Sequence, residues 1–356
     1  MTAEIANVVA EEPGYWVGAL FGNERFGEQL SPRIERHRLP FTGATPLPFV
    51  RQLNPHRIAL AAQRIGELAP DLVVVSQGTI EMGLAGILGG RRARRRTVSY
   101  IPLAYTFRQV GSVMAWLRDA LGSRFYRIPD HFIVEDLNQA ALVVSHGART
   151  APFVIPYPVM VSAPARLRRT TVERQGTQKQ VGVIGRVYDR HKNQGILPEV
   201  VERLHDLGVS VVVHILGSGP DLEWLRALVA RRRLQESFVF HGWLSRPALH
   251  SFVATTLDMV LVPSHFEGVP LAMLEAIALG VPTVVGNLDC VSAYQMPDYL
   301  QMNQRDAADI ARVVTGALAD PRWESFEGFR ERVLARHTRA AFVAAVGSTF
   351  QSLMGS

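Results

Sequence analysis

Short apolar runs alternate with longer amphipathic segments along most of the chain. The apolar runs are rich in Val, Ile and Leu, which is typical of strands buried on both faces of a parallel sheet. In the second half the expected strands are Val181–Gly185, Val209–Leu216, Phe238–His241, Met259–Pro263 and Val281–Val285. Helical spacing is found at Gly195–Leu207, Asp221–Leu234, Pro247–Thr255, Leu271–Gly280, Arg305–Ala319 and Trp323–Thr338. This alternation predicts an α/β domain whose parallel sheet is covered by helices on both faces.

The first half shows the same alternation less regularly. Its expected strands are Tyr15–Phe21, Glu35–Leu39, Asp71–Ser76, Thr97–Leu103, a strand at the end of Pro129–Glu135, and Ala151–Pro156. Its expected helices are residues 1–11, Asn54–Leu68, Ile80–Leu88 and Asp136–Val143. Asn54 and Pro55 are a typical helix start, because Asn caps free backbone N–H groups and Pro has none to leave unpaired. A second parallel α/β domain is therefore expected here.

The length of 356 residues also favours two domains over one. A stretch from 158 to 178 is rich in Pro, Arg, Thr and Gln and has no sustained period, so it is interpreted as an interdomain linker. The predicted division is residues 1–160 for the N-terminal domain, 161–179 for the linker and 180–338 for the C-terminal domain. Ala340–Met354 has apolar residues at helical spacing and forms a final helix.

The turn after the strand at Met259–Pro263 is the main candidate for chemistry. Gly268, Val269, Pro270 and Leu271 lead into a helix, whose first N–H groups and dipole favour an anion. Glu267 before the turn and Glu275 within the helix would repel phosphate but accept hydrogen bonds from hydroxyls. A nucleotide-sugar, with phosphates between two hydroxyl-bearing groups, fits both features. The alternative is one acid at a helix start and another on a solvated face.

Glu267 and Glu275, with Gly268, Pro270, Gly280 and Pro282, resemble the paired-glutamate signature of glycosyltransferase family 4 (glycosyl transferases group 1). The supporting motifs lie between about residues 180 and 320. The resemblance implies a retaining enzyme with the GT-B fold, in which two Rossmann-like domains with parallel sheets face a central cleft. It also implies that the final helix, 340–356, packs back on the first domain. Glu275 would bind the ribose hydroxyls, and Glu267 those of the transferred sugar.

Two further motifs resemble the same family. Gly185 and Arg186 end a strand, and Lys192 follows after a loop one residue longer than usual; the family holds the donor diphosphate with such a pair. Arg offers a planar donor fork and Lys a point charge, although either could be a surface cation. Gly217, in a strand-to-helix turn, would lie near the nucleotide. The alternative for Gly217 is a tight turn that needs positive φ.

The sequence departs from the family in several places. The region of the family's N-domain histidine holds Tyr100, and Tyr157-Pro158 replaces an Asn-Gly pair. The glycine-rich loop expected near residues 289–294 is absent. Residues 1–11 resemble the first helix of the fold, so its opening strand is expected to be missing. A rival reading makes Tyr15–Phe21 that strand and needs a helix at 28–36, but Pro32 disfavours it.

The chain carries 38 Lys and Arg against 32 Asp and Glu, a net charge of +6. Arginine clusters occur at Arg91, Arg92, Arg94, Arg95 and Arg96, at Arg166, Arg168 and Arg169, and at Arg231, Arg232 and Arg233. The first is expected to contact an anionic membrane surface, although clusters of this kind also occur on solvated faces. Nucleic acid is not expected as a partner, because no aromatic side chains interleave with the arginines.

The remaining features concern location and metal. Cys290 is alone and excludes an internal disulfide, which favours a reducing cytoplasm. No signal peptide and no apolar run long enough to cross a bilayer is present, so a cytoplasmic enzyme, peripheral on the inner face of the membrane, is expected. His131, His146, His241 and His265 lack the spacing of metal ligands, and no metal or cofactor is expected.

The resemblance implies a retaining, metal-independent hexosyltransferase. The donor is expected to be a UDP-sugar and the acceptor a hydroxyl of a glycan or a lipid-linked glycan in cell-surface polysaccharide synthesis. Arg186, Lys192 and the N–H groups after Glu267 would stabilise the departing diphosphate. One alternative is a nucleotide-sugar-binding protein without transferase activity. Another is a dinucleotide-dependent enzyme, which the incomplete glycine fingerprint at Gly217 argues against.

Overall fold

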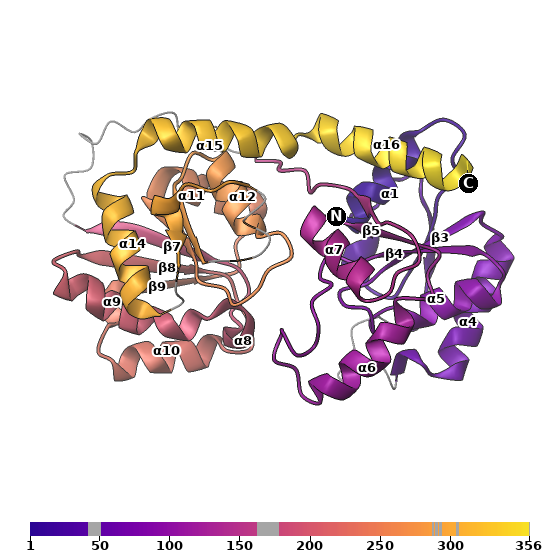
Figure 1. Ribbon diagram of the computed structural model, residues 1–356, viewed down its shortest axis with the longest axis horizontal. Coiled ribbons are helices and arrows are strands. Elements are labelled where there is room, and N and C mark those ends of the chain that lie inside the picture. Colours follow the sequence, from indigo (N-terminus) through magenta and orange to yellow (C-terminus); the bar gives the residue numbers. More distant parts are fainter. Residues whose placement is uncertain are drawn as a thin grey trace. The chain divides into compact units, whose positions relative to one another are not determined.

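The chain forms two compact units (Figure 1). Unit 1 comprises Met1–Pro158 and Arg339–Ser356, and unit 2 comprises Val159–Thr338. The computed structural model describes residues 1–41, 51–161, 178–286, 288, 291, 294–303 and 306–355. Most of the predicted linker, together with Arg166, Arg168 and Arg169, lies outside these residues. So does most of the stretch from 289 to 294 in which the glycine-rich family loop is absent.

Unit 2 is built on a six-stranded sheet in which every neighbouring pair is parallel. In sheet order its strands are β12 (Gln301–Met302), β11 (Thr283–Gly286), β10 (Met259–Val262), β7 (Lys179–Ile184), β8 (Val211–Leu216) and β9 (Phe238–Gly242). The central strands are buried on both faces, which explains their near-continuous apolar sequences. The predicted parallel sheet is therefore confirmed, and β12 is an addition to it.

Helices flank this sheet. They are α8 (Asp189–Lys192), α9 (Leu197–Asp206), α10 (Leu222–Arg231), α11 (Arg246–Thr256), α12 (Leu271–Ala278), α14 (Ala307–Ala319) and α15 (Trp323–Arg336), with single 3₁₀ turns at Gln194–Ile196, Gln235–Ser237 and Asp298–Leu300. The predicted helices agree with these to within a few residues. Helix α12 ends where the sequence indicates, since Gly280 adopts a φ of +76° just beyond it.

Unit 1 holds a four-stranded parallel sheet in the order β3 (Leu72–Ser76), β4 (Arg96–Tyr100), β5 (His131–Val134) and β6 (Phe153–Val154). A separate parallel pair joins β1 (Gly18–Phe21) to β2 (Glu35–Arg38). The rival reading that placed a helix at 28–36 is wrong, because β2 begins at Glu35 and the nearest helix, α2, spans only Glu24–Gly27.

The helices of unit 1 are α1 (Thr2–Glu11), α4 (Pro55–Leu68), α5 (Leu84–Arg92), α6 (Ala115–Phe125), α7 (Leu137–Ser145) and α16 (Arg339–Gly355). Asn54 caps α4 by accepting the N–H groups of His56 and Arg57. Helix α16 shares an apolar core with α1 and the four-stranded sheet, in which Phe342 and Val346 are fully buried.

Two predictions in unit 1 need correction. Helix α5 begins at Leu84 and not at Ile80, because the Gln77 side chain donates to the carbonyls of Ile80 and Met82 and holds residues 77–83 in a turn. Helix α6 has no counterpart among the predicted elements. Its apolar residues do not follow one face, so the helical spacing that reveals the other helices is absent from it.

Candidate functional site

The carboxyl ends of β7 and β10 bring two of the predicted motifs together. These strands are neighbours in a parallel sheet, so the segments that follow them leave the sheet at the same edge. After β7 the chain passes Gly185 and Arg186 and enters α8, which ends at Lys192. After β10 it passes Glu267 and enters α12. The sheet topology thereby places residues from positions about 75 apart in the sequence beside each other.

Glu267 is buried, with 6% of its surface exposed, and is held by three neighbours. Lys192 Nζ donates to its Oε1 at 2.6 Å, and Ser264 Oγ donates to the same oxygen at 2.6 Å. His191 Nε2 lies 3.6 Å from the other oxygen, Oε2. Among the described residues, Oε1 therefore carries two short hydrogen bonds, whereas Oε2 lies near the more distant imidazole.

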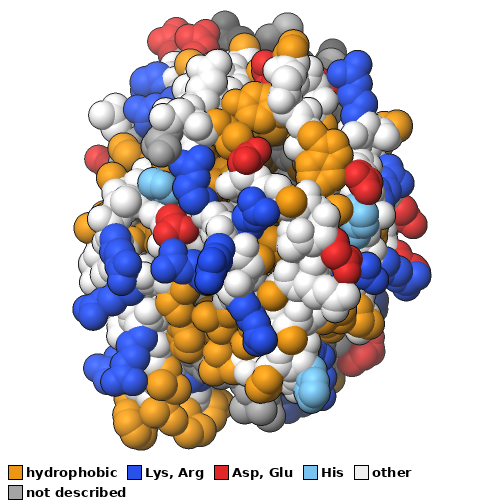
Figure 2. Space-filling model, turned by 90° about the vertical axis from the view of Figure 1, so that its right-hand side faces the viewer, with side chains coloured by type: hydrophobic (Ala, Val, Ile, Leu, Met, Phe, Trp, Pro, Cys, Tyr) orange, Lys and Arg blue, Asp and Glu red, His pale blue; other side chains and the backbone are white. Residues whose placement is uncertain are grey.

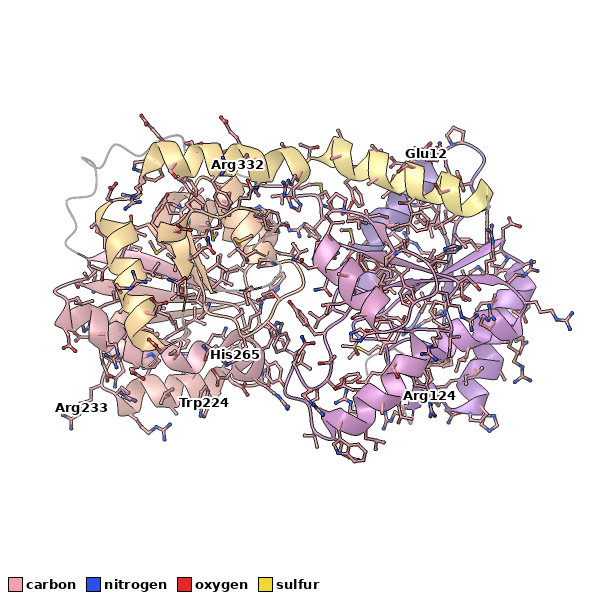
Figure 3. All side chains as sticks on the ribbon, in the orientation of Figure 1. Glu12, Arg124, Trp224, Arg233, His265 and Arg332 are labelled. Carbon is pink, nitrogen blue, oxygen red and sulfur yellow. The ribbon has the colours of Figure 1, made fainter. Side chains whose placement is uncertain are left out.

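The loops after β7 and β10 are also tied to each other. The backbone N–H of His265 donates to the carbonyl of His191 at 2.9 Å, and Figure 3 shows His265 in the loop that precedes α12. The rings of His191 and Phe266 stack at 4.3 Å, nearly parallel. These contacts fix the position of Lys192 relative to Glu267.

Opposing effects determine the pKa of Glu267. Burial favours its neutral form, but the neighbouring His191 ring, the charge of Lys192 and the hydrogen bonds from Lys192 and Ser264 outweigh burial. The net result is a pKa below the ordinary value for a glutamate. Glu267 is therefore a carboxylate at neutral pH, which accepts hydrogen bonds and does not donate a proton.

The N-terminus of α12 follows Glu267 directly. Pro270 precedes the first turn, and its carbonyl accepts the N–H groups of Met273 and Leu274. The N–H groups of Gly268, Val269 and Leu271 come before those that bond within the helix. They and the helix dipole create a partial positive charge at this point, as the sequence predicts for residues 268–271.

Glu275 lies further along α12 and faces α11. Its two carboxylate oxygens are 3.5 Å from Arg246 Nη2 and 3.7 Å from His250 Nε2, and its side chain is 14% exposed. Beyond Glu275, the Arg330 guanidinium donates to the carbonyls of Ile277 and Ala278 at 3.1 Å each, which stabilises the C-terminus of the helix.

Arg186 and the two glycines complete the predicted set. Arg186 is exposed, and its guanidinium carbon lies 5.6 Å from the centre of the Tyr188 ring. Gly217 contacts the turn after β7 so closely that a Cβ there would lie 1.9 Å from the carbonyl oxygen of Gly185. Gly185 itself has a φ of +136°. Close backbone packing between two strand ends therefore explains Gly217, and the structure does not require a nucleotide for it.

Several residues around the site were not predicted. Ser264 and His191 contact Glu267, and Arg246 and His250 lie beside Glu275. The one available signal was position, since His191 precedes Lys192 and Ser264 lies three residues before Glu267. No group of three or more His, Cys, Asp or Glu side chains that could hold a metal occurs in the described part of the chain.

In unit 1, Tyr100 stands in the region where the family has a histidine. The Tyr100 hydroxyl donates to the Glu135 carboxylate, and both side chains are buried. Burial and the neighbouring Glu135 charge raise the pKa of Tyr100 well above its ordinary value. The Tyr100 hydroxyl is therefore already bonded to Glu135 inside the core of unit 1.

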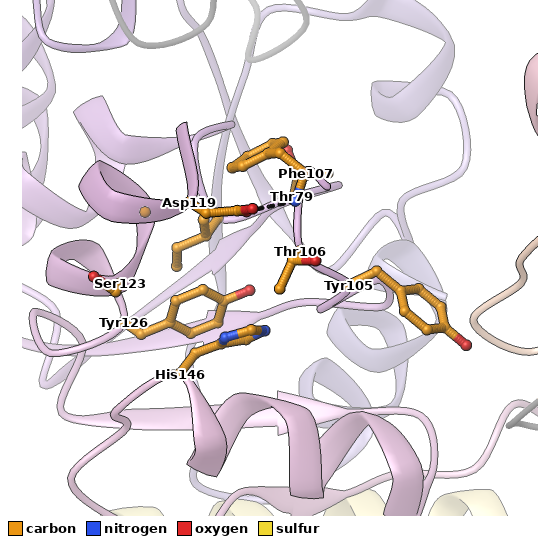
Figure 4. A pocket seen from close by; sticks show the side chains of 10 residues that line it. Thr79, Tyr105, Thr106, Phe107, Asp119, Ser123, Tyr126 and His146 are labelled. Carbon is orange, nitrogen blue, oxygen red and sulfur yellow. Dashed lines mark hydrogen bonds between the residues drawn. The ribbon is translucent and has the colours of Figure 1, made fainter. Parts of the chain in front are cut away.

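A pocket lies beside this core in unit 1 (Figure 4). Hydroxyl-bearing and aromatic side chains line it, among them Thr79, Tyr105, Thr106, Phe107, Ser123, Tyr126 and His146. Asp119 at its wall accepts the N–H groups of Phe107 and Arg108. His146 Nε2 donates to the carbonyl of Ala104 at 2.8 Å, and the buried Thr79 hydroxyl has no hydrogen-bond partner among the described residues.

Comparison with known proteins supports the assignment from the motifs. A family model described as "Glycosyl transferases group 1" matches residues 167–333, the part of the chain that holds Glu267, Glu275, Arg186 and Lys192. This match assigns residues 167–333, slightly less than half of the chain, to a glycosyl transferases group 1 domain. The chain is also 30% identical to 2-deoxystreptamine glucosyltransferase from Streptomyces kanamyceticus, over 45% of this chain and 42% of that protein.

Other relatives match shorter parts of the chain. The lipopolysaccharide 1,6-galactosyltransferase of Escherichia coli K12 is 33% identical over 22% of each chain. The matched region thus spans less than half the length of these curated relatives.

Among solved structures, sucrose-phosphate synthase from Thermosynechococcus elongatus aligns with a TM-score of 0.80 and 19% identity, covering 99% of this chain and 92% of that one. The Anabaena protein Alr3699/HepE, solved with UDP and glucose, gives a TM-score of 0.72 and 17% identity over 100% and 96% of the two chains. These similarities confirm the predicted GT-B fold.

Proposed function

We propose that this protein is a retaining glycosyltransferase of family 4. It transfers a sugar from a nucleotide-diphosphate donor, a UDP-sugar, to a hydroxyl of a glycan or of a lipid-linked glycan, in the synthesis of cell-surface polysaccharide. The observation that carries the proposal is the cluster of Lys192, Glu267 and Ser264 at the N-terminus of α12. The family match supports the activity, and the UDP bound to Alr3699/HepE supports the choice of donor.

The diphosphate would lie against the positive groups at the sheet edge where β7 and β10 end. Arg186 is exposed and available to a ligand, and the N–H groups of residues 268–271 present the positive end of a helix dipole. During transfer the bond from the sugar's anomeric carbon to the phosphate oxygen breaks, and negative charge grows on the diphosphate. Fixed positive groups stabilise that charge, which is commonly the largest contribution to catalysis.

The acceptor hydroxyl forms its bond to the anomeric carbon on the face from which the diphosphate leaves. Its proton passes to the leaving phosphate oxygen, so this step needs neither a covalent intermediate nor a metal ion. Glu267 contributes through position and charge. Because Oε1 already accepts Lys192 and Ser264, Oε2 is the oxygen that remains for a hydroxyl of the transferred sugar. Glu275 would accept the ribose hydroxyls.

Unit 1 provides the acceptor side in this proposal. The pocket of Figure 4 suits a sugar, because its wall combines hydroxyl groups with the aromatic rings of Tyr105 and Phe107. The Thr79 hydroxyl, unpartnered among the described residues, would bond to an acceptor hydroxyl. A buried polar group without a partner is unfavourable, and a ligand there would remove that penalty.

Transfer assays on Arg186→Ala test the proposal. Nucleotide-sugars are first screened for thermal stabilisation of the protein and for slow donor hydrolysis. With the donor so found, Arg186→Ala is expected to lower kcat about 100-fold, the usual effect of removing one group that stabilises transition-state charge. The matched control is Arg190→Ala, which removes an exposed cation of α8.

Three outcomes contradict parts of the proposal. Equal transfer rates for the Arg186→Ala protein and the wild type would remove Arg186 from the mechanism. Nucleotide binding in calorimetry without transfer or hydrolysis would identify a binding protein. Loss of activity in EDTA, restored by a divalent ion, would contradict metal independence.

A further inference from the structure

An exposed apolar tip lies where α6 begins in unit 1. It consists of Val113, Met114 and Trp116, whose exposed fractions are 73%, 58% and 66%. Single exposed apolar side chains are ordinary on protein surfaces, but three within four consecutive positions form a patch. The tip is therefore a candidate contact surface.

The backbone conformation of Met114, within the tip, is also energetically unfavourable. Met114 precedes the first residue of α6 with a φ of +53° and a ψ of +35°, in the left-handed region. A residue with a Cβ is disfavoured there by about 1 to 2 kcal/mol, and Gly or Asn is the usual choice. The sequence keeps a large apolar side chain where neither exposure nor conformation favours it. A function of the side chain explains this better than stability does.

Exposed arginines precede the tip in the sequence and follow it at the far end of α6. Arg108, Arg124 and Arg127 are exposed, and Figure 3 shows Arg124 on α6. Asp119 is the only acidic residue between positions 101 and 128, and its carboxylate accepts the N–H groups of Phe107 and Arg108. Arg118 is paired with the buried Glu81 and stacks on Phe107, so it adds no unbalanced charge.

We propose that the apolar tip inserts into an anionic lipid bilayer while Arg108, Arg124 and Arg127 contact the lipid phosphates. Trp and Met suit the boundary between headgroups and acyl chains, and basic residues add attraction to anionic lipids. A second copy of the chain is a poorer partner, because a symmetric contact would place these arginines against each other. The inference stands without the proposed transferase activity.

The arginine cluster predicted from the sequence fits this role less well. Arg91 and Arg92 end α5 and Arg96 begins β4, so the cluster lies at the amino end of that strand, whereas the tip follows its carboxyl end. Arg91 is paired with Asp130 at 2.7 Å. No large hydrophobic side chain is exposed between residues 54 and 112, which are all described. In Figure 2 acidic side chains stand among the basic ones, whereas apolar side chains gather at the lower end, the end at which Figure 1 shows α6.

Vesicle co-sedimentation tests the proposal. The wild-type protein is expected to bind vesicles of phosphatidylcholine and phosphatidylglycerol at low salt, and to bind pure phosphatidylcholine at least about tenfold more weakly. Val113→Ser with Met114→Ser and Trp116→Ser should reduce binding to the anionic vesicles at least about tenfold. Brominated lipids should quench wild-type tryptophan fluorescence more than that of Trp116→Phe.

Matched variants separate the tip from other surfaces. Trp243 in unit 2 is 78% exposed, so Trp243→Ser removes a similar apolar side chain and should leave vesicle binding unchanged. Arg108→Gln with Arg124→Gln should weaken binding about tenfold, whereas Arg92→Gln with Arg94→Gln, which removes the same charge, should not. Thermal unfolding checks that each variant folds.

Four results would overturn the proposal. The first is that the wild-type protein does not bind anionic vesicles, and the second is that the serine variant binds them as strongly as the wild type. The third is that the Arg92 and Arg94 variant loses more vesicle binding than the Arg108 and Arg124 variant. The fourth is that the wild type forms a dimer in analytical ultracentrifugation and the serine variant does not.

Discussion

Glu267 and Glu275 lie eight residues apart, and the sequence assigns both to ligand hydroxyls, yet their surroundings differ. Glu267 is buried and carries two hydrogen bonds of 2.6 Å on one oxygen, from Lys192 and Ser264. Glu275 is more exposed, and its cationic neighbours, Arg246 and His250, stand at 3.5 and 3.7 Å. The Glu267 carboxylate is held by short hydrogen bonds, whereas the Glu275 carboxylate stands in longer ion pairs.

The difference indicates two kinds of contribution. A buried carboxylate paired with a lysine is part of the structure, so its loss should affect folding as well as catalysis. A carboxylate at ion-pair distance retains its capacity to accept hydrogen bonds from a ligand. Glu267 should therefore couple stability to transfer, and Glu275 should act mainly on donor affinity.

The largest effect is expected from Lys192→Met. This change leaves the Glu267 carboxylate buried without its cation, which should lower the free energy of unfolding by about 3 kcal/mol. Urea unfolding followed by circular dichroism measures the loss. Lys179→Met, at the first residue of β7, is the control and should change the free energy of unfolding much less.

A second change separates charge from packing. Adding Glu267→Gln to Lys192→Met removes the unpaired carboxylate, so most of the lost stability should return. Transfer should stay low, because both groups are absent from the site. If the double variant is no more stable than Lys192→Met alone, the loss comes from the lysine's packing and the ion pair is not its cause.

Acid titration should separate Glu267 from another buried ionisable group of unit 2, His214. His214 Nε2 donates to Gln180 Oε1 at 2.7 Å, so its Nδ1 accepts from His241 Nε2 at 2.9 Å, and a proton on Nδ1 would oppose this contact. Burial, with a smaller effect of His241, lowers the pKa of His214 from 6.5 to about 4. The unfolded chain therefore binds more protons than the fold between these pH values, and stability falls as pH falls from 6.5 to 4.

The expected loss is about 2 to 3 kcal/mol and can be measured by urea unfolding at each pH. Glu267 has a lowered pKa, so its contribution is complete above the ordinary value of 4.5 and is lost only as pH falls through the folded value. A His214→Gln variant should thus show a flatter curve from pH 6.5 to 4 and the wild-type slope below. Parallel curves over the upper range would exclude His214 as the cause.

Much of the fold could be predicted because its elements have strong periodic signals. The strands of unit 2 are continuous apolar runs, and the helix from Leu271 has a glycine at its end. Helix α6 could not be predicted, since its apolar side chains are spread around the helix and two arginines, Arg118 and Arg124, interrupt them. The start of α5 was misplaced because hydrogen bonds from the Gln77 side chain, and not the local spacing, hold the preceding turn.

The site could be predicted only as far as its motifs extend. Lys192 and Glu267 were both candidates, and the sheet topology brings them within 2.6 Å, a contact that no spacing rule gives. Ser264 and His191 belong to no motif and become visible only when the loops after β7 and β10 are placed together. Gly217 was interpreted in two ways, and its contact with the Gly185 carbonyl gives the structural reason for a glycine.

The smallest effect is expected from Glu275→Gln, which tests the other half of the comparison. Gln keeps the size of the side chain but accepts hydrogen bonds without a charge, so the donor should bind about tenfold more weakly, near 1.4 kcal/mol. Calorimetric titration with the nucleotide-sugar measures the change, and Glu223→Gln on the exposed face of α10 is the control. The free energy of unfolding should change by less than about 1 kcal/mol, because the neighbours of Glu275 stand at 3.5 Å or more. If Glu275→Gln instead destabilises the protein as strongly as Lys192→Met while donor affinity stays unchanged, Glu275 is a structural residue and the distinction between the two carboxylates fails.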